Sequence, residues 1–185
     1  MSTADHVIVT PFTDWARSQP TYSQALRSLA KVYGLAFKQA GGTSLRANTL
    51  EIEMEREGHR YLVARLEPSP EPERLIGFVS WRPWGEPRHQ LAELTHIGVD
   101  VNDPEVRGLG RRLVTAMEDT AHSHYRGYSQ RGARKIFILT HADNTRAHNL
   151  YGRCGYTLEA RLPSFFHPGM DELYFSKTWL EHVAT

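Results

Sequence analysis

The sequence predicts an α/β (α+β) fold, with a mixed, mostly antiparallel sheet of about six or seven strands and helices on both faces. Three observations lead to this prediction. Apolar stretches of strand length recur along the chain, and its second half runs strand, helix, strand, helix, strand. The length of 185 residues is that of one domain, so we expect residues 1–185 to form a single domain.

The first predicted elements are a short strand and two helices. Residues 6–9 alternate polar and apolar side chains before Pro11, which predicts a strand at an edge of the sheet. Over residues 22–37 the apolar positions recur at spacings of three and four, the pattern of a helix with one buried stripe. A weaker pattern of the same kind over 44–56 predicts a second helix.

Three strands are predicted next. Residues 61–66 and 75–84 have the composition of two strands of a hairpin, joined by an exposed loop rich in proline and glutamate. Residues 91–101 predict a further strand. Because side chains alternate along a strand, we expect Glu93 and His96 on opposite faces of it.

Helices and strands alternate in the rest of the chain. Apolar residues spaced four apart predict a helix over about 110–127. Residues 135–140 form a nearly unbroken apolar run, typical of an internal strand buried on both faces. A helix is predicted over 145–153, and the last two strands over 157–161 and 173–176.

Composition excludes several classes of protein. The chain has 22 Lys and Arg against 21 Asp and Glu, and its net charge of +1 provides no long-range attraction for nucleic acid or an anionic membrane. No apolar run approaches the roughly 20 residues of a membrane-spanning helix, and residues 1–10 lack the pattern of a signal peptide. The single cysteine, Cys154, fits a reducing compartment. We therefore expect a cytoplasmic protein without a membrane partner.

The segment 105–112, Glu-Val-Arg-Gly-Leu-Gly-Arg-Arg, lies between a predicted strand and a predicted helix. Unpaired amides at the start of a helix, together with the helix dipole, favour an anion there. Gly108 and Gly110 lack side chains, so a pyrophosphate could approach these amides closely. Positive potential would come from three arginines: Arg107, Arg111 and Arg112. The segment is neither a Walker loop nor a complete dinucleotide fingerprint, since a Gly-Lys-Ser/Thr sequence and a third glycine are both missing.

Two segments resemble the hallmarks of the GNAT superfamily of acyl-CoA-dependent N-acyltransferases. Residues 105–110 are similar to its motif of Gln or Arg, two variable residues, Gly, one variable residue, and Gly or Ala. Residues 144–156, Asn-Thr-Arg-Ala-His-Asn-Leu-Tyr-Gly-Arg-Cys-Gly-Tyr, agree at every marked position with Asn-x-x-Ala-x-x-Leu-Tyr-x-x-x-Gly-Phe/Tyr. The resemblance covers about 91–177. It implies a GNAT-type domain and an N-acetyltransferase that moves an acetyl group from acetyl-CoA to a primary amine by direct attack.

The resemblance also implies where the donor binds. The pantetheine arm of CoA would contact backbone exposed at Ile97, Gly98 and Val99, and the pyrophosphate would lie on the segment 105–112, Leu109 included. Spacings of three and four allow three residues to face one cleft: Asn144, Ala147 and Tyr151. Asn144 can either cap its helix or bind the donor. The resemblance assigns Tyr151 the role of general acid toward the leaving thiolate.

A general base is needed because the attacking amine must be neutral. Glu93 is our first candidate, since histone-acetylating relatives place their base at a matching offset in the corresponding strand. His141, at the end of its strand, is the reserve candidate, and His96 is weaker because it faces the other way. No cysteine nucleophile is predicted at Cys154. No metal is predicted either, because the remaining histidines lack ligand spacing.

The acceptor pocket is expected between the first two helices and a loop over 162–170, where Phe165 and Phe166 could line it or could be core anchors. The partner would be a small-molecule or peptide amine, and a homodimer is compatible with the sequence. The acceptor itself is not identified by these residues.

Glu105 departs from the resemblance, because a carboxylate beside a pyrophosphate is repulsive unless it is paired or turned to solvent. Two alternatives therefore stay open. One is a GNAT-fold enzyme with another donor, either a longer acyl-CoA or an aminoacyl-tRNA. For the tRNA, a patch could form from five arginines: Arg126, Arg131, Arg134, Arg146 and Arg153. The other is a non-catalytic module that binds CoA or a protein.

Overall fold

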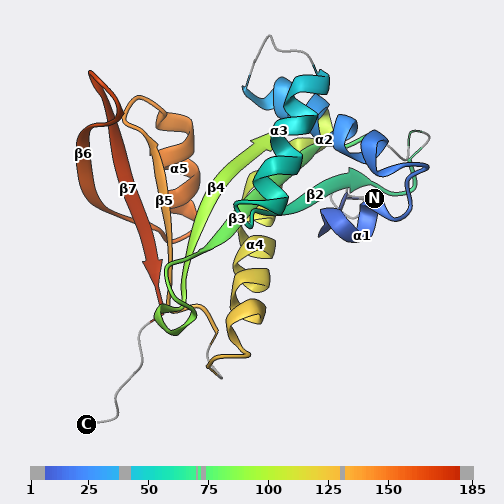
Figure 1. The fold of residues 1–185 in the computed structure, drawn as a ribbon. Coiled ribbons are helices and arrows are strands. Elements are labelled where there is room, and N and C mark those ends of the chain that lie inside the picture. Colours follow the sequence, from blue (N-terminus) through green and yellow to red (C-terminus); the bar gives the residue numbers. More distant parts are fainter. Residues whose placement is uncertain (1–6, 38–42, 70, 72–73, 130–131, 180–185) are drawn as a thin grey trace. The chain divides into compact units, whose positions relative to one another are not determined.

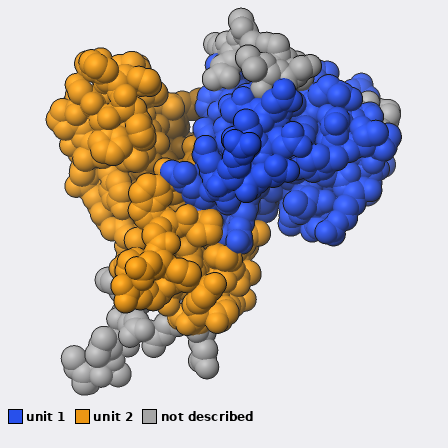
Figure 2. Space-filling view, in the orientation of Figure 1, with its two compact units in different colours: residues 1–82, 96–117 blue, residues 83–95, 118–185 orange. Residues whose placement is uncertain are grey.

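The computed structural model describes residues 7–37, 43–69, 71, 74–129 and 132–179. The chain divides into two compact units (Figure 2): unit 1 contains residues 1–82 and 96–117, and unit 2 contains residues 83–95 and 118–185. All three boundaries fall inside regular elements, namely β3 (Gly77–Trp84), β4 (Leu91–Val99) and α4 (Leu109–Tyr125).

The strands form one seven-stranded sheet in the order β1-β2-β3-β4-β5-β7-β6. Strand β4 pairs in parallel with β5, and the pairs β1-β2, β2-β3, β5-β7 and β6-β7 are antiparallel. The predicted fold class, a mixed and mostly antiparallel sheet with helices, is confirmed.

Unit 1 contains the first three strands and three helices (Figure 1). Their bounds are β1 (Val7–Pro11), α1 (Phe12–Ala16), α2 (Tyr22–Phe37), α3 (Thr43–Glu55), β2 (Arg60–Leu66) and β3, with the short 3₁₀ helix η3 (Pro104–Val106) before α4. β2 pairs with β1 and with β3, so that Val63 lies opposite both Thr10 and Phe78. The prediction that β2 and β3 are antiparallel neighbours is confirmed.

A hydrophobic core holds the helices of unit 1 on its strands. The spacing of three and four in α2 places Leu29 on the inner side, where it is fully buried together with Leu50 of α3 and Phe78 of β3. The ring of Tyr33 stacks on that of Phe78, with centroids 5.1 Å apart. The amphipathic pattern therefore predicted both the bounds of α2 and the face that it buries.

Unit 2 contains the remaining strands and α5. After the 3₁₀ helix η2 (Pro87–His89), its elements are β5 (Lys135–His141), α5 (Thr145–Arg153), β6 (Thr157–His167) and β7 (Met170–Thr178). Four residues of β4, Leu91–Leu94, pair with Lys135–Ile138, and β5 then continues to His141. Isoleucines at 136 and 138 are buried in β5, as the unbroken apolar run predicted.

The expected loop over 162–170 is wrong. β6 extends to His167 and β7 begins at Met170, so the segment is the end of a long hairpin. The register between the two strands shifts between Leu162 and His167, and this irregular pairing explains why the strand pattern was missed. The helix α1 was also missed, because five residues are too few to show a period. None of the helices in the described ranges is long and apolar enough for a membrane span.

Candidate functional site

The donor residues predicted on β4 and α4 all belong to unit 1. Gly98 lies against α2: a Cβ built on it would be 2.5 Å from Cβ of Ala36 and 2.8 Å from Cε1 of Phe78. Contacts this short require glycine, so Gly98 allows a close approach between β4 and α2. Its neighbours Ile97 and Val99 are both half-buried.

The predicted phosphate cradle forms a turn that leads into α4. Gly108 has φ +78°, a left-handed conformation that favours glycine, and a Cβ on it would meet open space. Leu109, the first helical residue, is 1% exposed and anchors the turn. Its side chain lies 3.0 Å from the position that a Cβ on Gly77 would take. Gly108 is exposed and Gly110 is half-buried.

The arginines of this segment are not equivalent. All three are exposed, and the Arg112 guanidinium also donates a hydrogen bond to the carbonyl of Val7, at 2.5 Å. Arg112 therefore ties α4 to β1. Arg107 and Arg111 place positive charge on the solvent side of this turn. The side chain of Glu105 lies outside the described structure.

Asn144 caps α5 in unit 2. Its side-chain oxygen accepts a hydrogen bond from the amide of Ala147, at 3.2 Å, and its amide nitrogen lies 3.5 Å from the hydroxyl of Thr140. Of the two roles considered for Asn144, the cap is the one the geometry shows. Ala147, in the first turn, is half-buried.

Tyr151 lies at the other end of α5. It is 5% exposed, and its ring centroid is 5.9 Å from that of Phe175 and 6.3 Å from that of Tyr156. Burial, and to a smaller extent the nearby Cys154, raises the pKa of the Tyr151 hydroxyl. The hydroxyl is therefore protonated at neutral pH, as an ordinary tyrosine is, and can donate a hydrogen bond.

Glu93 is a buried carboxylate in the same unit. It is 8% exposed and lies on β4 opposite Phe137 of β5. Carboxylates are rarely buried without a structural or functional reason. Tyr151 and Glu93, the two catalytic candidates, are thus both buried groups of unit 2.

His96 lies in a polar cluster of unit 1. Burial, more than any charged neighbour, lowers the pKa of His96 to about 4, so its ring is neutral near pH 7. Its Nδ1 is 3.3 Å from the hydroxyl of Ser80, and its ring meets that of Tyr33 edge-on. His96 is packed against α2, which agrees with its ranking as the weaker base candidate.

Sequence reasoning missed the partners of His96. Glu53, His59 and His96 bring ligand atoms within 4.8 Å of one another, a spacing that a metal ion could bridge. The Arg46 guanidinium, however, lies 3.2 Å from the Glu53 carboxylate, which also accepts a hydrogen bond from the Tyr61 hydroxyl. Arg46 already supplies the compensating positive charge, so the geometry describes an internal ion-pair network.

His141 has a buried partner that the sequence did not reveal. Its Nδ1 lies 2.8 Å from a carboxylate oxygen of Glu172, which is 2% exposed and directly opposite it on β7. The ring is not aligned for a hydrogen bond to this oxygen, so the two groups are in close contact without one. His141 lies four residues beyond Phe137, the partner of Glu93, or roughly 13 Å at about 3.3 Å per residue. Glu93, beside Phe137, and His141 would therefore act at different positions along the paired strands β4 and β5.

Phe165 and Phe166, considered for the acceptor pocket, lie near the end of the β6–β7 hairpin. They are 53% and 57% exposed, and their rings contact each other with centroids 4.8 Å apart. They are therefore not core anchors.

Comparison with known proteins supports the motif assignment. The sequence profile described as "Acetyltransferase (GNAT) family" matches residues 24–156. No curated protein sequence matches the chain.

Solved structures with the same fold include three with ligands. A GNAT-family acetyltransferase from Elizabethkingia anophelis with acetyl-CoA bound has 16% identity and a TM-score of 0.63, over 95% of this chain and 99% of that one. The yncA protein of Salmonella typhimurium with acetyl-CoA has 17% identity and a TM-score of 0.61, over 97% of both chains. Spermidine N-acetyltransferase from Vibrio cholerae with CoA and spermine has 16% identity and a TM-score of 0.61, over 94% and 96%. With a profile match over most of its length, the chain belongs to the acetyltransferase (GNAT) family of acyl-CoA-dependent N-acetyltransferases.

Proposed function

We propose that the protein transfers an acetyl group from acetyl-CoA to a primary amine by direct attack, with Glu93 as general base and Tyr151 as general acid. One observation carries the assignment: a buried carboxylate and a buried, protonated tyrosine lie in the same unit, each at its motif position. The carboxylate of Glu93 can accept a proton from the acceptor, and the hydroxyl of Tyr151 can donate one.

The proton balance of the reaction gives each group one task. The acceptor arrives as an ammonium ion and passes one proton to the Glu93 carboxylate, which later releases it to solvent. The neutral amine attacks the thioester carbonyl, and the tetrahedral intermediate expels the CoA thiolate. Tyr151 donates its proton to the thiolate sulfur and recovers one from the cationic amide nitrogen. The products are the amide and CoA thiol, with one proton released overall.

The donor is assigned to the residues that the motifs mark. Gly108 and Gly110 leave backbone amides open to the pyrophosphate, and the exposed Arg107 and Arg111 add positive charge. The cap at Asn144 fixes where α5 begins, and this sets the face of the helix on which Tyr151 lies.

The acceptor is proposed to be a small-molecule or peptide amine. A polyamine is a reasonable first probe, because a solved structure with this fold is a spermidine N-acetyltransferase with spermine bound. Another structure of that enzyme is dodecameric, so the oligomeric state of this protein should be measured together with its activity.

Acetyl-CoA binding by titration calorimetry, followed by thiol release with spermidine and other amines, tests the proposal. Saturable binding and amine-dependent thiol release are expected. Absence of acetyl-CoA binding would refute the proposed donor and favour a longer acyl-CoA or an aminoacyl-tRNA. Binding without turnover on any amine would favour a non-catalytic module.

Two substitutions test the catalytic roles. Tyr151→Phe should lower kcat by about 10²- to 10⁴-fold, the usual contribution of general acid–base catalysis, with little change in acetyl-CoA affinity. Tyr128→Phe, at a 59% exposed position of the same unit, is the control and should leave kcat unchanged. An unaltered rate for Tyr151→Phe would remove Tyr151 from the acid role.

Glu93→Gln should abolish the rise of kcat/KM between acid and neutral pH, because the amide cannot accept the proton of the ammonium. Glu86→Gln, at an exposed carboxylate of unit 2, is its control. If the pH profile of Glu93→Gln matches that of the wild type, the base is another group, with His141 the next to test.

A further inference from the structure

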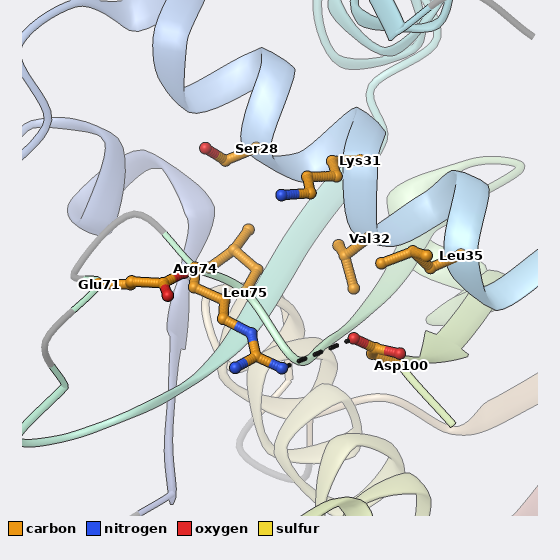
Figure 3. A pocket seen from close by; sticks show the side chains of 8 residues that line it. All are labelled: Ser28, Lys31, Val32, Leu35, Glu71, Arg74, Leu75 and Asp100. Atoms are coloured by element: carbon orange, nitrogen blue, oxygen red, sulfur yellow. Dashed lines mark ion pairs between the residues drawn. The ribbon is translucent and has the colours of Figure 1, made fainter. Parts of the chain in front are cut away.

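A cavity of about 350 Å³ lies in unit 1, and none of its lining residues is among those assigned to acetyl transfer (Figure 3). One wall is the outer side of α2, and the other is the segment before β3 together with Asp100, which follows β4. The volume is at the lower end of the roughly 300–1,000 Å³ of small-molecule sites. The cavity is therefore large enough for a small metabolite.

The carboxylate of Asp100 lines this cavity and is largely buried. Its side chain is 9% exposed, and its Oδ1 accepts hydrogen bonds from the backbone and side-chain nitrogens of Asn102, at 3.1 and 3.3 Å. Its Oδ2 is 3.9 Å from the nearest guanidinium nitrogen of Arg74, too far for a hydrogen bond. The backbone amide of Asp100 bonds to the carbonyl of Ile76, at 2.8 Å, which holds the residue in place. Because no residue in the described ranges donates a hydrogen bond to this second oxygen of a largely buried carboxylate, an ammonium group beside it is favoured.

Two cations lie on the same cavity. The Arg74 guanidinium is held by a 2.8 Å ion pair with the buried Asp103. Lys31 is exposed, extends from α2 toward the cavity in Figure 3, and makes no ion pair with any residue in the described ranges. Asp103 balances Arg74, and the remaining carboxylate, the exposed Glu71, lies on the side of the view away from Asp100. The ligand should therefore carry an anionic group as well as a cationic one.

Apart from Ser28, the rest of the wall is apolar. Val32 and Leu75 are buried, and Leu35 is 39% exposed. Because Lys31, Val32 and Leu35 recur at helical spacing, α2 presents the cation and the apolar surface on one face. An aliphatic side chain would cover the exposed part of Leu35 and remove it from water, beside Val32 and Leu75, which the core already buries.

We propose that this cavity binds a free aliphatic α-amino acid. Its ammonium group donates to Oδ2 of Asp100, its carboxylate lies between Lys31 and Arg74, and its side chain packs on Val32, Leu35 and Leu75. A zwitterion can pair with Asp100 and with the two cations at once, whereas a simple amine pairs only with Asp100 and a simple carboxylate only with the cations. This proposal does not rest on the proposed acetyl transfer, and leucine binding is measured without acetyl-CoA.

Amide NMR of the isotope-labelled full chain provides the test, with three probes of similar shape. L-leucine carries both charges, leucinamide only the positive one, and 4-methylpentanoate only the negative one. Leucine should shift the amide signals of Lys31, Leu35 and Asp100 saturably, and the other two probes should bind at least about 10-fold more weakly, the loss expected for one charged hydrogen bond. No saturable shift with leucine, or equal binding of a singly charged probe, would overturn the proposal.

Variants locate the site. Asp100→Asn keeps an acceptor for Asn102 but loses the charge, and should weaken leucine binding by about 10- to 100-fold. Lys31→Ala, at an exposed position that folding does not require, should weaken it by a smaller factor. Asp14→Asn, at an exposed aspartate of unit 1, is the matched control and should bind leucine like the wild type. Leucine binding that survives both cavity substitutions would place it elsewhere and refute the assignment.

Discussion

Gly98→Ala should destabilise the protein although it adds only one methyl group. The new Cβ would lie 2.5 Å from Cβ of Ala36 and 2.8 Å from Cε1 of Phe78, whereas non-bonded carbons prefer about 3.5–4.0 Å. Neither neighbour can yield easily, because Cβ of Ala36 is attached to the backbone of α2 and Phe78 is fully buried. The strand or the helix must therefore move by roughly 1 Å, the difference between these distances.

Overpacking of this kind costs about 1–3 kcal/mol in the free energy of unfolding. For a chain of this size each kcal/mol corresponds to about 2–4 °C in Tm. Thermal and urea unfolding followed by circular dichroism would measure both quantities. Gly152→Ala is the matched control, because Gly152 is in α5 and a Cβ there meets nothing within 4 Å. This control should stabilise the protein by about 0.5–1 kcal/mol.

A Gly98→Ala protein as stable as the wild type would refute the reasoning, since it would mean that β4 and α2 are not held at the distance described. Equal destabilisation by both substitutions would also contradict it, because the contacts of the two glycines differ.

Two further predictions concern stability. Asn144→Ala should lower the free energy of unfolding by about 0.5–2 kcal/mol, the usual value of an N-cap, and Asn144→Ser should recover most of it; urea unfolding would show whether the cap is real. The pKa of His96 falls from 6.5 in the unfolded chain to about 4 in the folded one. The unfolded chain therefore binds the extra proton between pH 6.5 and 4, and stability falls as pH decreases through this window, by at most about 1.4 kcal/mol per pH unit. His96→Asn should flatten this dependence in unfolding titrations, and an unchanged slope would show that His96 is not the group responsible.

The motifs explain why so much of the candidate site could be predicted. Residues 144–156 combine a cap, a helical spacing and a terminal glycine within one short segment, and each of these depends on local geometry. The structure accordingly has α5 at Thr145–Arg153, Asn144 as its cap and Tyr151 buried. For the same reason the periodic stripe of α2 predicted its bounds at Tyr22 and Phe37.

Other features depend on which strands become neighbours, and no local pattern contains that information. Glu172 is one residue among several polar ones near the end of the chain, and only the pairing of β5 with β7 brings it to His141. The cluster of Glu53, His59 and His96 brings a strand residue to a helix residue and a loop residue that lie far earlier in the sequence. Phe165 and Phe166 were placed in a loop because irregular pairing of β6 interrupts the alternation of side chains.

The sequence by itself determined the fold class, the family and the residues at which the donor motifs lie, because these follow from short-range spacing and residue type. Only the tertiary structure decided which of those residues are buried, which are caps and which face solvent. Arg111 and Arg112 are adjacent in one motif and both are exposed, yet it is Arg112 that bonds to Val7, more than 100 residues earlier. The physical reason is that burial and charge pairing are set by contacts between distant segments, and these contacts form only when the chain folds.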